Sequence, residues 1–196
     1  MERVETERLS LRRWRTADVI DAFAEMNRDP DVTRFLKAGR PMGSAESEEQ
    51  SNRIAAHWDR HGFGLWAVFT RGAKRMIGFA GLQHPAWMPD DAHRVEVGWR
   101  LERTAWGKGY ATEAGTAALA AGFGTLGLGE VISLIQVGNE RSIAVAERLG
   151  LAEQRPATHP EQGFPLVIYA MDRDRWLRQN ALADRDAAVE LGGSRR

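Results

Sequence analysis

A glycine-rich hexapeptide, Trp106-Gly107-Lys108-Gly109-Tyr110-Ala111, constrains this 196-residue chain more than any other stretch. The run before it, 94–101, alternates and carries β-branched and aromatic residues, which is typical of a strand. The run after it, 112–126, is rich in alanine and predicts a helix. Glycines between a strand and a helix let several backbone N–H groups point at one spot, where the helix N-terminus adds about half a positive charge. The stretch therefore predicts a loop that binds a phosphate or pyrophosphate, with Lys108 adding a full charge.

Three known phosphate-binding patterns can be compared with this loop. The nucleoside-triphosphate pattern G-x-x-x-x-G-K-[ST] does not occur in the chain, and the dinucleotide pattern G-x-G-x-x-G fails because Thr112 stands at its third glycine. The acetyl-CoA pattern [QR]-x-x-G-x-[GA] fits at every position but the first, where Trp106 replaces Gln or Arg. The alternative interpretation is a strand–helix turn whose glycines serve geometry alone. On the hexapeptide by itself, both interpretations stay open.

Composition excludes several classes of function. The formal net charge is zero, so nothing draws the chain generally to nucleic acid or to an anionic membrane. There is no cysteine, which removes disulfides, thiolate metal sites and a cysteine nucleophile. The charged N-terminus lacks the apolar core of a signal peptide, and no apolar run approaches membrane-spanning length. We expect a cytoplasmic protein without a direct nucleic-acid or membrane partner.

The pattern along the chain predicts an α+β protein, in which hairpins and helices are segregated. The expected elements are a strand at 9–12, a helix capped by Thr16, a helix opened by the capping box Ser47-x-x-Gln50, strands at 65–70 and 76–83, a loop at 84–92, the strand, turn and helix described above, a strand from 131, a helix ending at Gly150, a strand at 164–171 and a helix beginning at 172–177. We expect one domain over 1–177 and a polar tail over 178–196 that is either helical or disordered.

The ordered motifs together resemble the GNAT family of N-acetyltransferases, and within it the RimJ/RimL-like subgroup of ribosomal-protein N-terminal acetyltransferases. The strings that carry the resemblance are Thr6-Glu7-Arg8-Leu9-Ser10-Leu11-Arg12, Trp66-Ala67-Val68, Ile77-Gly78-Phe79-Ala80-Gly81-Leu82, Glu96-Val97-Gly98-Trp99, the hexapeptide, Asn139-x-x-Ser142 and Leu149-Gly150-Leu151. The resemblance runs from about Thr6 to Trp176. It implies a mostly antiparallel, splayed central sheet flanked by helices. It also implies direct transfer of an acetyl group from acetyl-CoA to a primary amine, without a covalent enzyme intermediate.

The resemblance also implies how acetyl-CoA is held. The backbone N–H groups of the hexapeptide, which comprises Trp106, Gly107, Lys108, Gly109, Tyr110 and Ala111, would take the pyrophosphate. The pantetheine arm would pair as a false strand with the backbone around Trp99 and Leu101. Gly98 is the expected site of a β-bulge that splays the sheet. Asn139 would bond either the pantetheine or its own loop.

Candidates for the acid and the base follow from the same resemblance. Many relatives protonate the thiolate with a Tyr at the position of Ala146, which this chain lacks; the RimL-like subgroup uses a Ser, and Ser142 stands at that place. The alternative role of Ser142 is a helix N-cap. Glu96 is the first candidate for the general base, acting through a water, and its alternative role is a solvent-facing charge or an ion pair with an Arg. Glu102 and His93 are weaker candidates.

The acceptor is expected to be a primary amine, either a protein N-terminal α-amine or a small molecule. An indistinct base favours an amine of low pKa, because an α-amine near pKa 8 needs little help at neutral pH. Trp87 and Trp99 are candidates for the acceptor pocket. Only His57 and His61 have metal-ligand spacing, and because no third ligand stands near them we expect no metal site. A homodimer is expected from the resemblance.

Two rival functions remain open. The chain can be a catalytically idle acyl-CoA-binding sensor or interaction module, an interpretation that Trp106 and the missing Tyr favour. A nicotinamide- or nucleotide-binding protein is the weaker alternative.

Overall fold

The computed structural model describes residues 2–36, 39–85 and 94–181. Its centre is a single eight-stranded sheet with the order β1-β2-β3-β4-β5-β6-β8-β7. The strands are β1 (Arg3–Glu5), β2 (Leu9–Arg13), β3 (Leu65–Thr70), β4 (Gly78–Gln83), β5 (Glu96–Leu101), β6 (Glu130–Gln136), β7 (Ala152–Thr158) and β8 (Pro165–Asp172). Every neighbouring pair is antiparallel except β5 and β6, which are parallel. The predicted α+β class and mostly antiparallel sheet are confirmed.

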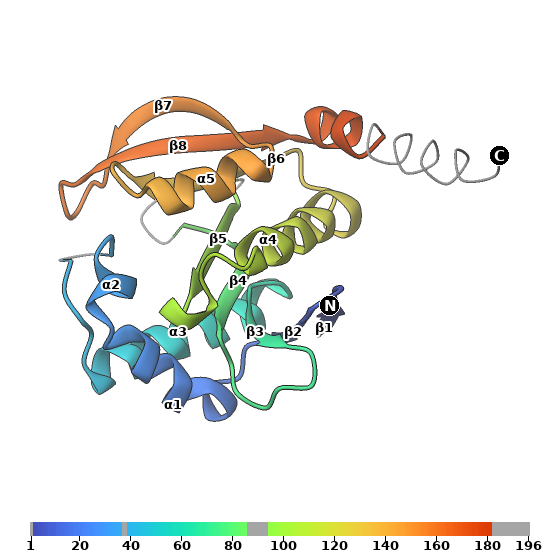
Figure 1. Ribbon diagram of the computed structural model, residues 1–196. Helices are drawn as coiled ribbons and strands as arrows, with labels where there is room; N and C mark the ends of the chain where they lie inside the picture. The colour runs from blue at the N-terminus through green and yellow to red at the C-terminus, as the bar shows by residue number, and fades with distance from the viewer. Residues whose placement is uncertain (1, 37–38, 86–93, 182–196) are drawn as a thin grey trace.

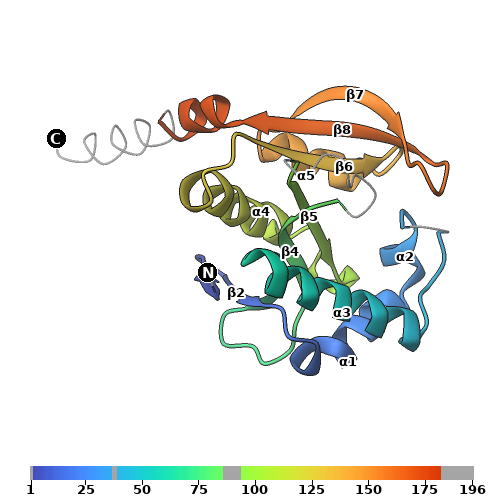
Figure 2. The same ribbon diagram turned by 180° about the vertical axis from the view of Figure 1, so that it is seen from behind.

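Helices cover both faces of this sheet. They are α1 (Thr16–Asn27), α2 (Pro30–Thr33), α3 (Ser44–His61), α4 (Tyr110–Ala120), which continues as a π-helical turn (Ala121–Thr125), α5 (Glu140–Arg148) and a helix over 173–181. Figure 1 shows α4 and α5 on the near side of the sheet, and Figure 2, seen from behind, shows α1 and α3 on the opposite side. No helix of the described segments is long and apolar enough to cross a membrane.

The sheet opens between β5 and β6. These two strands pair at one register position in the described chain, Glu96 with Ile132, and then diverge (Figure 1). The predicted bulge at Gly98 is wrong, because the register between β4 and β5 runs without a shift from Gln83 opposite Glu96 to Gly78 opposite Leu101. The unusual backbone lies in β4 instead: Gly78 has φ +146, and a Cβ there would come within 2.2 Å of the carbonyl oxygen of Arg100.

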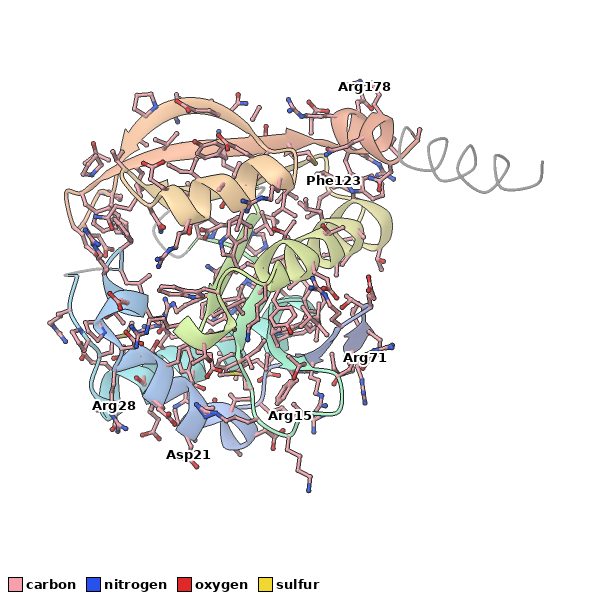
Figure 3. All side chains as sticks on the ribbon, in the orientation of Figure 1. Arg15, Asp21, Arg28, Arg71, Phe123 and Arg178 are labelled. Carbon is pink, nitrogen blue, oxygen red and sulfur yellow. The ribbon has the colours of Figure 1, made fainter. Side chains whose placement is uncertain are left out.

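The hydrophobic core lies between the sheet and its helices. Trp14, Trp58 and Trp66 are almost fully buried, and α4 contributes Ala114 and Ala118 at 0% exposure. Alanines on this face allow α4 to approach β4 and β5 closely, which positions the turn before it. The C-terminal helix is anchored by Trp176, whose ring centroid lies 5.5 Å from that of Phe123, labelled in Figure 3.

Several element boundaries differ from the sequence prediction. Helix α3 begins at Ser44, because Gly43 is its N-cap and the carboxylate of Glu46 accepts the N–H of Gly43. Ser47 is therefore inside the helix, buried, with its hydroxyl accepting a hydrogen bond from Asn27. Thr16 is the first helical residue of α1 and not its cap. Strands β1 and β7 and helix α2 were not predicted, and the predicted loop at 84–92 and tail at 178–196 fall largely outside the described residues.

Candidate active site

The glycine turn has the backbone that its sequence predicts. Gly107 and Gly109 have φ +73 and +79, a region that residues with a side chain rarely adopt, and Gly109 is the N-cap of α4. The N–H groups of Gly107, Lys108 and Gly109 donate to no backbone oxygen in the described chain. The N–H of Trp106 already donates to the carbonyl of Arg103 at 3.2 Å, so it is not the free donor we expected. The available donors therefore begin at Gly107 and continue into the first turn of α4.

A partly buried carboxylate, that of Glu113, joins this turn to the N-terminal hairpin. Glu113, in the first turn of α4, accepts hydrogen bonds from the Thr6 hydroxyl at 2.5 Å, the Arg8 N–H at 2.8 Å and Arg8 Nε at 2.7 Å. The same guanidinium donates from Nη1 to the carbonyl of Lys108 at 2.9 Å. Desolvation pulls the pKa of Glu113 upward, but these hydrogen bonds outweigh it and lower the pKa. Thr6 and Arg8 thereby hold the loop shape in place from another part of the sequence.

Trp106, which departs from the acetyl-CoA pattern, locks the loop to the preceding strand. Its Nε1 donates to the carbonyl of Leu101 at 2.8 Å. The guanidinium of Arg141, at the start of α5, lies 4.4 Å from the centroid of the Trp106 rings, in a cation–π contact. The indole thus fixes one wall of the opening between the strands and contacts the other.

The backbone of β5 beyond Glu96 faces this opening. The backbone N–H of Ile132 donates to the carbonyl of Val95, and the backbone N–H of Glu102 donates to the carbonyl of Ile77, each at 2.9 Å. The backbone groups of odd-numbered residues of β5 therefore face β6, and those of even-numbered residues face β4. Trp99 and Leu101 consequently direct their backbone groups at β6, which pairs with neither of them in the described register. The Leu101 carbonyl is used by Trp106, while the N–H groups of both residues and the carbonyl of Trp99 face the gap. The geometry fits an extended ligand lying there as an additional strand.

Glu96 lies where β5 and β6 part. Its carboxylate accepts hydrogen bonds from Gln83 Nε2 at 3.1 Å and from the backbone N–H of Leu134. Burial raises its pKa to about 7, and these two hydrogen bonds oppose that rise only in part. It forms no ion pair with any described arginine, so neither alternative role, a solvent-facing charge or an ion pair, describes it. A carboxyl with a pKa near neutrality can accept and release protons at physiological pH.

Ser142 and Asn139 meet at the start of α5. Asn139 is the N-cap, and its side-chain oxygen accepts the N–H of Ser142 at 3.3 Å. The alternative in which Ser142 is itself the cap is therefore wrong. Its hydroxyl donates to no described residue, and the side chain is half-buried. Asn139 thus performs the capping and leaves the Ser142 hydroxyl available to a ligand. Gly150 ends the helix in the left-handed conformation, as predicted.

The remaining candidates are placed away from catalysis or outside the described residues. Glu102 accepts from the Thr104 hydroxyl at 2.7 Å and pairs with Arg75 at 3.4 Å, so it already has partners. The side chain of Trp99 packs against the main hydrophobic core. His93 and Trp87 lie outside the described residues.

The prediction that no third ligand lies near His57 and His61 is wrong. His84, at the end of β4, joins them, and one ring nitrogen of each of the three lies within 4.8 Å of the others. The sequence could not indicate this because the fold brings the residues together. Both nitrogens of His57 are already hydrogen-bonded, Nδ1 to the carbonyl of Phe63 and Nε2 to the N–H of His84, each at 3.0 Å. His57 therefore ties the end of α3 to the end of β4, and the expected absence of a metal stays a prediction.

Comparison with known proteins agrees with this geometry. The family model described as an acetyltransferase (GNAT) domain matches residues 8–152. An Aspergillus fumigatus protein named FsC-acetyl coenzyme A-N(2)-transacetylase is 29% identical over 79% of this chain and 69% of its own length. An acetyltransferase structure from Agrobacterium tumefaciens is 27% identical, with a TM-score of 0.74, and the match covers 87% of this chain and 94% of that one.

A more distant structural neighbour was solved with a bound ligand. It is RimL, the ribosomal L7/L12 α-N-protein acetyltransferase in complex with coenzyme A, at 18% identity and a TM-score of 0.71, with 89% of this chain and 99% of that chain covered. At this identity the likeness concerns the fold alone. The family match, by contrast, spans most of the chain. The chain belongs to the GNAT acetyltransferase family and is an acetyl-CoA-dependent N-acetyltransferase.

Proposed function

We propose that this enzyme transfers the acetyl group of acetyl-CoA to a primary amine of low pKa by direct attack within a ternary complex. The observation that carries the proposal is the position of Glu96, a partly buried carboxyl with a pKa of about 7 at the point where β5 and β6 part. The acetyl-CoA turn lies at the far end of the same strand, so one short strand connects the cofactor site with the base.

Glu96 is the general base in this proposal. At neutral pH about half of its population is ionised, and an ionised Glu96 accepts a proton from the substrate ammonium through an intervening water. The hydrogen bonds from Gln83 and Leu134 hold the carboxylate in one orientation. A base of this pKa suits an α-amine better than a lysine ε-amine, because the proton affinities of base and α-amine are nearly matched.

The free backbone of β5 polarises the acetyl carbonyl. The N–H groups of Trp99 and Leu101 face the opening and have no strand partner there, so either can donate to the carbonyl oxygen as negative charge develops on it. In other enzymes a single donor of this kind is worth about 10²–10³-fold in rate.

Ser142 stabilises the departing thiolate. Its hydroxyl is not used in capping and lies on the first turn of α5, whose N-terminus also favours a negative charge. A thiolate near pKa 8.5 is only weakly basic, so one hydrogen bond is sufficient help at neutral pH. Ala146, at the position of the family's Tyr, is fully buried and cannot take this role.

The glycine turn and the first turn of α4 hold the pyrophosphate. Their N–H groups converge with the positive end of the helix, and the exposed Lys108 adds its charge. The residues assigned to the cofactor are Trp99, Leu101, Trp106, Gly107, Lys108, Gly109, Tyr110, Ala111 and Ser142, with Trp106 contributing its side chain and not its N–H. Asn139 acts indirectly, as the N-cap that positions Ser142.

The acceptor is either a peptide α-amine, as in the RimJ/RimL-like subgroup, or a small-molecule amine. The ordered motifs support the first, and the name of the Aspergillus relative, an acetyl-CoA N(2)-transacetylase, is compatible with the second.

The proposal is tested by incubating the enzyme with acetyl-CoA and a panel of N-terminal peptides and small amines. We expect a mass gain of one acetyl group on at least one acceptor, with release of free coenzyme A thiol. Glu96→Gln should abolish most turnover, whereas the matched control Glu48→Gln, an exposed residue of α3, should not. Tight binding of acetyl-CoA without turnover on any amine would contradict the proposal and favour an acyl-CoA sensor.

A further inference from the structure

Arg100 is a partly buried cation on the face of β5 that also carries Glu96 and Gly98. Side chains alternate along a strand, so these three residues point to the same side of the sheet. Nη1 of Arg100 donates to Asn27 Oδ1 at 3.0 Å and to Gln50 Oε1 at 3.2 Å. Its guanidinium lies 5.0 Å from the centroid of the Phe79 ring. These contacts fix the side chain firmly, but both hydrogen-bond acceptors are neutral amides.

No described carboxylate pairs with Arg100. Its Nε is enclosed and has no hydrogen-bond partner. Desolvation lowers the pKa of Arg100 to about 10, so the group still carries its charge at neutral pH. Enclosing a charge without a counter-ion is costly, and proteins usually pair such groups. The chain therefore maintains an unneutralised cation whose partner is not part of its described residues.

A second polar atom without a partner lies across the opening. In the described chain, the enclosed side-chain polar atoms without a hydrogen bond are Arg100 Nε and Gln136 Oε1. Because Glu96 lies opposite Ile132, the even-numbered residues of β6, including Gln136, point to the same side as Arg100. Both residues thus belong to the two diverging strands and to one face of the sheet, so the polar groups without partners gather beside the opening.

Space for such a ligand lies between Glu96 and Arg100. A Cβ built at Gly98 meets nothing within 4 Å, so the middle of this face is open. Glu96 and Arg100 both keep some accessible surface although protein surrounds them, as expected for groups that line a recess. At about 3.3 Å per residue, their Cα atoms are about 13 Å apart. A base, an open position and a cation therefore follow one another along β5.

We propose that Arg100 binds a carboxylate of the acetyl acceptor, so that the enzyme selects primary amines that carry a negative charge several bonds from the amino group. The inference rests on the proposed function, in which Glu96 is the base. Nη2 of the guanidinium donates to no described residue and, unlike Nε, is not enclosed, so it can donate a charge-assisted hydrogen bond to a carboxylate in the opening. The separation between Glu96 and Arg100 requires several bonds between amine and carboxylate, as in an N-terminal peptide with an acidic side chain or in an ω-amino acid.

The test compares acceptors that differ only in this charge. The peptide arm uses Ala-Glu-amide against Ala-Gln-amide, and the small-molecule arm uses δ-aminovalerate against its carboxamide; both arms measure kcat/KM with saturating acetyl-CoA. We expect the charged member of at least one pair to be favoured about 10- to 100-fold. The arm with the larger preference identifies the source of the carboxylate.

Variants then assign the preference to Arg100. Arg100→Met keeps the apolar stem and removes the charge, so it should abolish the preference by lowering kcat/KM for the charged acceptor while leaving the neutral one within about twofold. Arg100→Lys should retain part of the preference, since the lysine ammonium keeps a positive charge at this position. Arg53→Met, an exposed residue of α3 with 51% side-chain exposure, is the matched control and should behave as the wild type.

Each outcome decides a definite point. Equal kcat/KM for charged and neutral acceptors in the wild type would overturn this inference alone, as would an equal loss on both acceptors in a folded Arg100→Met variant, which is the behaviour of a purely structural arginine. Absence of transfer to every amine would overturn the proposed function and this inference with it. The wild-type comparison needs no variant, so it decides even if Arg100→Met does not fold.

Discussion

The carboxylate of Glu96 accepts the backbone N–H of Leu134 across the point where β5 and β6 separate. Leu134 directs that N–H at β5, as Ile132 does two residues earlier, but β5 no longer lies within pairing distance. A side chain therefore replaces the lost backbone partner. The same burial that makes this replacement necessary raises the pKa of Glu96 to about 7.

Glu96→Gln should lower kcat by about 10²–10⁴-fold, the usual contribution of a general base. The amide keeps the size of the side chain and can still accept the N–H of Leu134, so the fold should persist. In the wild type, kcat/KM should fall below pH 7 as Glu96 becomes protonated, and the variant should lose this limb of the pH profile. Steady-state kinetics over pH 5.5–9 provides the measurement, with acetyl-CoA affinity by calorimetry as the control. An unchanged pH profile in the variant would remove Glu96 from the mechanism.

The same substitution should change how stability depends on pH. The Glu96 carboxyl titrates near 4.5 in the unfolded chain and near 7 in the folded one, so between these values the native state holds more protons. Its contribution to stability is thus greatest at low pH and is lost as the pH rises through 7. Gln at position 96 does not titrate, so the Glu96→Gln variant does not lose this stability as the pH rises. Its free energy of unfolding, compared with that of the wild type, should therefore increase from pH 4.5 to 7 and then level off. Urea denaturation at a series of pH values measures the difference, and a constant difference would contradict the account.

Substitution of Ser142 should mainly affect catalysis, whereas substitution of Asn139 should mainly affect stability. Ser142→Ala should lower kcat about tenfold with little effect on unfolding, because one charge-assisted hydrogen bond to the thiolate is lost while the cap remains. Asn139→Ala should cost about 1 kcal/mol of stability, because α5 loses its N-cap. Parallel kinetic and thermal measurements on both variants test this division. A loss of stability in Ser142→Ala comparable to that in Asn139→Ala would indicate a structural role for the hydroxyl.

Local sequence signals predicted the parts of the fold that depend on local chemistry. The left-handed glycines at 107 and 109, the end of α5 at Gly150 and the strands β2, β3 and β8 all follow from residue patterns within a few positions. The missed strands have weak patterns: β1 has only three residues, and β7 is largely exposed and contains Pro156. For α3, a polar first turn beginning at Ser44 concealed a start that Gly43 and Glu46 determine.

The parts of the site that the sequence did not predict depend on contacts between distant residues. Glu113 receives its hydrogen bonds from Thr6 and Arg8 of the N-terminal hairpin, more than a hundred positions away. The sequence does not predict that Trp106 contacts both the Leu101 carbonyl and Arg141, because the contact with Arg141 depends on the position of α5 beside the loop. The alternation of Glu96, Gly98 and Arg100 along the strand predicts that these three residues share one face of the sheet. The sequence does not reveal that Arg100 lacks an acidic partner, because this depends on where α1 and α3 lie.

Calorimetric titration of acetyl-CoA into two matched glycine variants decides whether the glycine turn binds the cofactor. Gly107 and Gly72 both have left-handed backbones, with φ +73 and +79, and a Cβ at either meets nothing within 4 Å. Alanine at either position should therefore impose a similar strain of about 1–2 kcal/mol. Gly72 lies in the turn between β3 and β4, away from the opening. We predict that Gly107→Ala weakens acetyl-CoA binding at least about tenfold, while Gly72→Ala binds as the wild type does; equal affinity in the two variants would contradict the account.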